Sequence, residues 1–173
     1  MPVRKCMGVV GVSAALGLAT PMAAADLNLP VATRVISFLQ PAPSGAIAAA
    51  IIYEPGNAAS EAEAASIERA GPLLVGKGTL RLKRVSVGAL GQLAGMRVAF
   101  VTAGLREQEG QIAAAAARQS TLTITSDLVC VQAAHCVVAI SSGSHVQITV
   151  SRAAAKAAKI QFGSAFLMLV KEI

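Results

Sequence analysis

The sequence predicts an α/β protein, a single compact three-layer domain whose sheet is mostly parallel, with a β-hairpin near the C-terminus and a buried C-terminal helix. Two observations support this fold class. Short apolar runs alternate with alanine-rich helical patterns over the first two thirds of the chain, which is typical of βαβ units. Two later strand patterns, Val137–Ile140 and Val146–Val150, flank a turn of small polar residues, which indicates a hairpin.

The first part of the domain is expected to contain a helix, a strand and a second helix. Leu29 to Leu39 is predicted to be a short helix, because Pro30 stands at its start and Pro41 and Pro43 follow its end. Ala46 to Tyr53 is a continuous apolar run, typical of a strand buried on both faces. Asn57 to Ala70 carries glutamates among alanines. It is predicted to be a helix with Asn57 or Ser60 as N-cap and with its acidic residues on a solvated face.

The middle of the chain continues the same alternation. Thr79 to Val87 alternates apolar and basic residues, which indicates a half-exposed strand at the edge of the sheet. Arg97–Thr102 and Thr121–Thr125 are predicted to be further strands, separated by a helix from Arg106 to Gln119. Asp127 to Ala134 is expected to be a loop.

The C-terminal stretch is apolar on almost every side, so we expect a helix buried in the core or against a partner. The predicted helix runs from about Ser151, its N-cap, to Lys171. The apolar residues expected in the core are Ile160, Phe162, Phe166, Leu167 and Leu169.

The N-terminus has the pattern of a secretory signal, predicted to span residues 1–25. Arg4 and Lys5 precede an uncharged apolar run, and Ala23-Ala24-Ala25 offers a small-residue cleavage site. The alternative is an uncleaved membrane anchor, for which the run is short. Cleavage after Ala25 leaves 173 − 25 = 148 residues, and 26–173 is predicted to be one α/β domain in the periplasm.

Composition and motifs argue against several function classes. Aromatic residues make up 3% of the chain and tryptophan is absent, so there is no stacking platform for bases, and nucleic acid is not an expected partner. The densest basic run, Lys77 to Arg84, is interpreted as a solvated strand face. No phosphate-binding glycine motif or nucleophile elbow occurs. We therefore predict no catalytic residues, no cofactor and no enzymatic activity.

Two cysteines remain after the predicted cleavage, and an even pair in an exported chain favours a disulfide between Cys130 and Cys136. The alternative is a metal site formed by Cys130, His135, Cys136 and His145. Against it, the spacing matches no standard zinc pattern, and adjacent residues of a strand point to opposite faces.

The end of the chain resembles the C-terminal signature of the YfiR-like periplasmic proteins. Thr121 to Asp127 is also similar to that family's L-T-V-S-D strand motif. Lys159 stands where the family usually has glycine, and the aromatic motif of the first helix is reduced to Phe38. The residues on matching signature positions are Lys156, Ala158, Ile160, Phe162, Ser164, Leu167 and Leu169.

This resemblance implies an exported, non-enzymatic regulator that binds a membrane-anchored signalling protein, such as a diguanylate cyclase controlling cyclic-di-GMP or a sensor kinase. Family members commonly carry cysteines in the 130–136 region, which supports the disulfide. We expect the partner to contact the Cys130–Cys136 loop, including His135, and the exposed side of the first helix around Arg34. A homodimer is a further expected assembly.

A function of another class remains open, a small periplasmic ligand-binding module. In open α/β sheets, ligands bind at the carboxyl ends of the strands. Polar residues gather at three such predicted ends, Tyr53-Glu54, Thr102–Gly104 and Ser126-Asp127.

Overall fold

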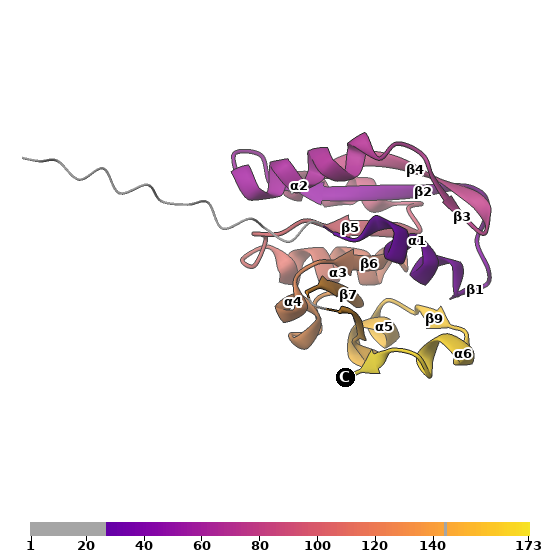
Figure 1. Cartoon of the computed structure of the whole chain (residues 1–173). Coiled ribbons are helices and arrows are strands. Elements are labelled where there is room, and N and C mark those ends of the chain that lie inside the picture. The colour runs from indigo at the N-terminus through magenta and orange to yellow at the C-terminus, as the bar shows by residue number, and fades with distance from the viewer. Residues whose placement is uncertain (1–26, 144) are drawn as a thin grey trace, which may run out of the picture.

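Within residues 27–143 and 145–173, which this computed structural model describes, eight strands form one sheet in the order β10-β8-β7-β6-β5-β2-β4-β3 (Figure 1). The predicted signal peptide, residues 1–25, lies outside the described part. Five neighbouring strands run parallel, which confirms the predicted sheet. They are β4 (Lys77–Ser86), β2 (Ser44–Tyr53), β5 (Val98–Val101), β6 (Leu122–Thr125) and β7 (Val138–Ser142).

The outer strands differ in part from the prediction. The hairpin is confirmed, because β8 (Val146–Val150) pairs antiparallel with β7. Beyond it, β10 (Lys171–Glu172) pairs parallel with β8 and forms that edge. At the other edge, β3 (Leu73–Val75) pairs antiparallel with β4. The prediction that the basic strand lies at the edge was therefore wrong, since the short β3 was not recognised.

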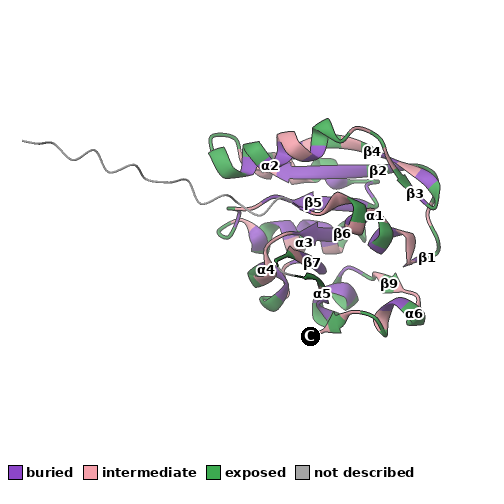
Figure 2. Ribbon diagram, viewed as in Figure 1, coloured by how far each residue is buried: buried purple, intermediate pink, exposed green. Residues whose placement is uncertain are grey.

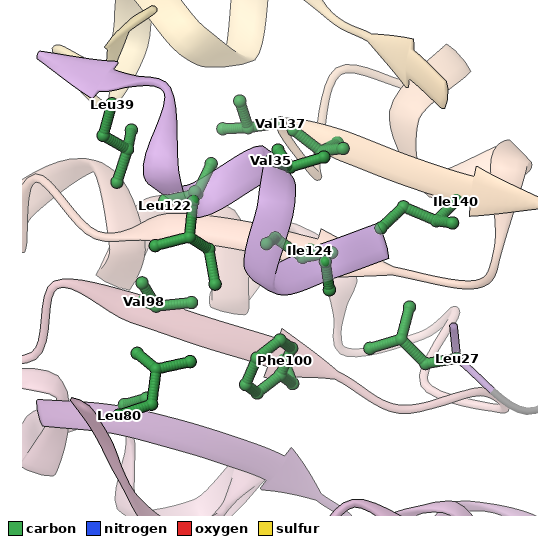
Figure 3. Close-up of a cluster of buried hydrophobic side chains, with 14 of the residues drawn as sticks. Leu27, Val35, Leu39, Leu80, Val98, Phe100, Leu122, Ile124, Val137 and Ile140 are labelled. Carbon is green, nitrogen blue, oxygen red and sulfur yellow. The ribbon is translucent and has the colours of Figure 1, made fainter. Parts of the chain in front are cut away.

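Helices cover both faces of the sheet, which gives the three layers (Figure 1). On one face, α1 (Leu29–Ser37) and α2 (Ala58–Arg69) pack on an apolar cluster that includes Phe100 and Ile124 (Figure 3). On the other face, a second cluster lies under a 3-10 helix, η1, and two α-helices. These are η1 (Val87–Leu93), α3 (Glu109–Gln119) and α4 (Leu128–Gln132).

Two helix starts show why the local sequence folds as it does. Asn57 precedes α2, and its side-chain Oδ1 accepts from the backbone N–H of Ser60 at 3.2 Å, which confirms Asn57 as the N-cap. Asp127 caps α4 in the same way by accepting from the N–H of Val129 at 2.8 Å. Residues 127–134, predicted to be a loop, therefore contain a short helix.

The predicted helix from Ser151 to Lys171 is not continuous. Ser151 is the N-cap of α5 (Arg152–Ala157), but Lys159 adopts a left-handed φ of 55°, which ends the helical path. The chain then forms β9 (Gln161–Phe162), which pairs antiparallel with β1 (Leu39–Gln40), and a single turn of helix, α6 (Ser164–Leu167). Strand pairing thus replaces helix in this apolar segment.

The apolar residues of this segment divide between core and surface. Phe166 is 2% exposed and stacks on Phe38 with ring centroids 5.1 Å apart. Ile160, Phe162 and Leu167 are partly buried against the same cluster. Leu169 is 80% exposed, so its predicted burial was wrong, because the helix that would have turned it inward ends before it. Among the described residues, no helix has the length and apolar character needed to cross a bilayer.

Candidate functional site

The carboxyl ends of β2, β5 and β6 lie side by side, because the three strands are parallel neighbours in the sheet. Glu54, Thr102 and Ser126 follow these ends directly. The structure thus brings together the three polar segments at which the sequence predicts a ligand site for the alternative function. The N-terminus of α2, which follows β2, lies against the same edge through side-chain contacts described below.

The hydroxyl groups at this edge are committed to internal hydrogen bonds. Thr102 Oγ1 donates to the carbonyl oxygen of Ile52 at 2.9 Å and accepts from Ser60 Oγ at 2.6 Å. Ser60 Oγ in turn accepts from the N–H of Glu54 at 2.9 Å. Both hydroxyl groups are buried. They join β2, α2 and β5, and this arrangement is structural.

Glu63 of α2 is 2% exposed and lies behind the same edge. Its carboxylate accepts from the N–H of Ala103 at 2.6 Å and from Ser126 Oγ at 3.1 Å, so it holds the segments after β5 and β6 together. The predicted solvated face was wrong for Glu63. A signal was available, since the buried positions of α2 are spaced as one helical stripe, at Ser60, Glu63, Ala64 and Ile67.

The outer rim of the edge is polar and hollowed. Glu54 accepts from Gln108 Nε2 at 2.9 Å and from Asn57 Nδ2 at 3.2 Å. Asn57 Nδ2 also donates to the carbonyl oxygen of Gly104 at 3.1 Å. An open hollow of about 380 Å³ is lined by Glu54, Asn57, Gly104, Arg106, Glu107 and Gln108.

The cysteine region forms a compact unit next to this edge. Cys130 and Cys136 are joined by a disulfide, the pairing expected from the sequence, and both are buried. Arg106 Nε lies 3.4 Å from Asp127 Oδ2, which links the segment after β5 to the N-cap of α4. His135 Nδ1 lies 3.3 Å from the largely buried Glu109 Oε2 at the start of α3. The disulfide therefore holds His135 against α3.

The two residues expected to contact a partner are not brought together. Arg34 is exposed on α1, which covers the face of the first apolar cluster. His135 follows α4, which packs on the opposite face. Each is accessible, but a single small contact surface would not include both.

The four residues of the alternative metal site do not come together as metal ligands. Both cysteine sulfurs are bonded to each other, and His145 is exposed in the turn between β7 and β8. Among the described residues, no group of three or more histidine, cysteine, aspartate or glutamate side chains is arranged to hold a metal ion.

A second surface, which the sequence did not indicate, lies near the C-terminus. Met168 and Leu169 are adjacent and are 86% and 80% exposed. Leu167, the residue before them, lines a groove of about 370 Å³ together with Ile160 and Phe162. Arg152 at this groove is hydrogen-bonded to Glu172 at 2.6 Å, and this bond raises the pKa of Arg152 above its usual value.

Comparisons with known proteins agree on fold and family. A sequence model described as YfiR/HmsC-like matches residues 51–171. No curated protein matches the chain. A crystal structure of a conserved domain protein from Vibrio cholerae O1 biovar El Tor is similar, with 12% identity and a TM-score of 0.58. The alignment covers 83% of this chain and 58% of that protein. Because the two sequences are only 12% identical, the likeness concerns the fold alone.

Proposed function

The chain belongs to the YfiR/HmsC-like family, and we propose that it binds a membrane-anchored signalling protein, such as a diguanylate cyclase or a sensor kinase, and modulates its output without catalysis. Members of this family regulate signalling in the periplasm and are not catalytic. The family match over residues 51–171 is the observation that carries the proposal.

The geometry of the polar edge supports a binding role. The buried hydroxyls of Ser60 and Thr102 are hydrogen-bonded to each other and to backbone groups, and no histidine is hydrogen-bonded to either. A nucleophile needs an adjacent base within hydrogen-bond reach. This network instead joins strands and helices into a rigid edge on which a contact surface can be displayed.

We place the partner contact on the surface that contains Met168 and Leu169. Adjacent apolar side chains as exposed as these are typical of protein–protein contacts. Arg34 and His135 remain proposed contributors, each on its own face of the molecule. The Leu169 site is the strongest of the three, because Met168 and Leu169 are adjacent and are the two most exposed large apolar side chains of the described residues.

Affinity capture from detergent-solubilised envelopes tests this contact. The native protein should recover a membrane-anchored sensor, and Leu169→Asp should recover much less of it. Val146→Asp is the matched control, because Val146 is 50% exposed at the start of β8 and lies in none of the proposed contact surfaces. Equal recovery by both variants would place the contact elsewhere, and Arg34→Glu and His135→Ala would then be compared in the same way.

Deletion of the gene tests the function itself. We expect the cellular cyclic-di-GMP level, or the output of another membrane sensor, to change on deletion. The native gene should restore it, and the Leu169→Asp variant should not. Unchanged signalling in the deletion strain would contradict the proposed function.

The hollow at the strand ends favours one alternative, a small ligand-binding module. Its rim offers the carboxylate of Glu54, the amide of Gln108 and the guanidinium of Arg106 to a polar molecule. Calorimetric titration of the purified protein with small-molecule extracts of the cell envelope, and with fractions of those extracts, tests this role. Saturable binding that Gln108→Ala weakens, in a protein whose deletion leaves signalling unchanged, would favour the alternative.

A further inference from the structure

One face of the sheet is left uncovered at the amino ends of β2 and β4. Side chains of β2 alternate between the two apolar clusters, so Ala46 and Ala48 share the face of Ala50 and Ile52. Further along the strands, η1 packs on this face, and Ile52 and Val85 are buried beneath it. Ala46 and Ala48 are exposed although β2 is an interior strand.

Cationic side chains flank these alanines. Ala48 is the register partner of Arg81 on β4, and Ala50 is the partner of Lys83. On the other side, Arg97 donates its backbone N–H to the carbonyl oxygen of Ala48 at 3.0 Å, directly before β5 begins. We call the surface formed by Lys77, Arg81, Lys83 and Arg97, with the neighbouring Leu74, the basic face.

The segment that carries this charge contains no acidic residue. Residues 71–105 contain Lys77, Arg81, Lys83, Arg84 and Arg97 and no aspartate or glutamate. The nearest preceding acid, Glu68, pairs with Arg84 at 2.9 Å, and Arg84 alternates onto the opposite face of β4. Within the part of the chain that the structure describes, none of the four cations of the basic face forms an ion pair.

The shape of the basic face indicates which kind of anion it could bind. It is an open strand surface with small side chains at its centre, and beside Arg97 it is hollowed to about 320 Å³ over Ala46 and Ala48. Leu74, the register partner of Thr79, points from the same face and is 79% exposed. Exposed residues are visible at this β3–β4 end of the sheet in Figure 2.

We propose that the basic face binds anionic phospholipid headgroups at a membrane surface. Headgroups present negative charge over a plane, which suits cations spread across two strands and the start of a third. An exposed leucine among cations suits the boundary between headgroups and acyl chains. An acidic protein segment is the alternative occupant, and the experiment below distinguishes it from a lipid surface. The inference does not depend on which signalling protein the chain regulates.

Co-sedimentation of the protein, purified from the periplasmic fraction, with lipid vesicles tests the proposal. Binding should be stronger with phosphatidylglycerol in phosphatidylcholine vesicles than with phosphatidylcholine alone, and it should weaken as salt is added. The triple variant Arg81→Gln, Lys83→Gln, Arg97→Gln should lose roughly a hundredfold in partitioning, given the attraction of each cation to an anionic surface. Leu74→Ser should also weaken binding, with the net charge unchanged.

A matched control removes three exposed cations elsewhere, through Arg69→Gln, Arg118→Gln and Lys159→Gln. It has the same net charge as the triple variant and should keep most of the binding. Unaltered thermal unfolding midpoints would show that both variants fold. Equal losses in the two variants, or no preference for phosphatidylglycerol, would overturn the proposal. Loss of sensor capture by the triple variant with vesicle binding intact would instead assign the face to an acidic protein partner.

Discussion

At the scale of single residues, the carboxylate of Glu63 joins the segments that follow β5 and β6. It is buried and accepts hydrogen bonds from the Ala103 N–H and the Ser126 hydroxyl. Glu63→Ala removes the acceptor of both donors and should lower the free energy of unfolding by about 3 kcal/mol. Urea denaturation of the purified protein measures this.

Glu61→Ala is the control on the same helix, because Glu61 is exposed and its hydrogen bond from the Gly56 N–H lies at the surface. We expect its effect to stay below about 1 kcal/mol, as for most surface substitutions. Similar losses for the two variants would mean that helix α2, and not the buried network, carries the effect.

Residue burial was predictable from the sequence only where side-chain type and spacing agree. Phe166 is apolar in an apolar stretch, and its burial was expected and is observed. Glu63 lies in the same helical stripe as Ser60 and Ile67, but the charge of its side chain suggested solvent. Which polar atoms meet a buried carboxylate depends on two other loops of the fold, and local sequence does not contain that information.

At the scale of secondary-structure elements, the aromatic contact between α6 and the chain after α1 should hold the C-terminal segment to the domain. Phe166 packs between Phe38 and Phe162 at ring-centroid distances of 5.1 and 5.0 Å. Phe166→Ala should lower the free energy of unfolding by about 3–5 kcal/mol. Leu169→Ala, three residues away and exposed, should change it by less than about 0.5 kcal/mol.

Thermal and urea unfolding of the two variants checks this pair of expectations. A near-neutral Phe166→Ala would mean that the segment can leave the domain without unfolding it. The segment from α5 to β10 is also where sequence reasoning failed most. Its alanines and dense apolar residues favour helix, whereas pairing of β9 with β1 and of β10 with β8 involves residues far away in the chain.

The disulfide connects α4 to the start of β7, and its loop is short. The chain-entropy model gives about 2 kcal/mol for closing so few residues, so the double variant Cys130→Ser, Cys136→Ser should remain folded. Hydrogen exchange should increase mainly in residues 127–136. Exchange that increases throughout the sheet would mean that the disulfide supports the whole domain.

At the scale of the whole molecule, the sequence was sufficient for the fold class. Three of the five parallel strands, β2, β5 and β7, contain apolar runs, and helices lie between successive strands. This pattern leaves few arrangements other than helices on both faces of a parallel sheet. The uncovered basic face was not predictable. It depends on η1 covering only part of that face of the sheet. The local sequence of β4 does not show whether its neighbour β2 carries exposed alanines such as Ala46 and Ala48.

The export of the molecule and its disulfide should be coupled. Residues 1–25 are predicted to be a cleaved signal, and a disulfide persists in oxidising compartments such as the periplasm. Protein expressed with its own leader should begin near Asp26 by N-terminal sequencing. Its peptide with Cys130 and Cys136 should be two hydrogens lighter than the reduced form in non-reducing mass spectrometry. Protein expressed from Asp26 without the leader should stay in the cytoplasm with free thiols. A chain that begins at Met1 and stays with the membrane would mean that residues 1–25 are an uncleaved anchor.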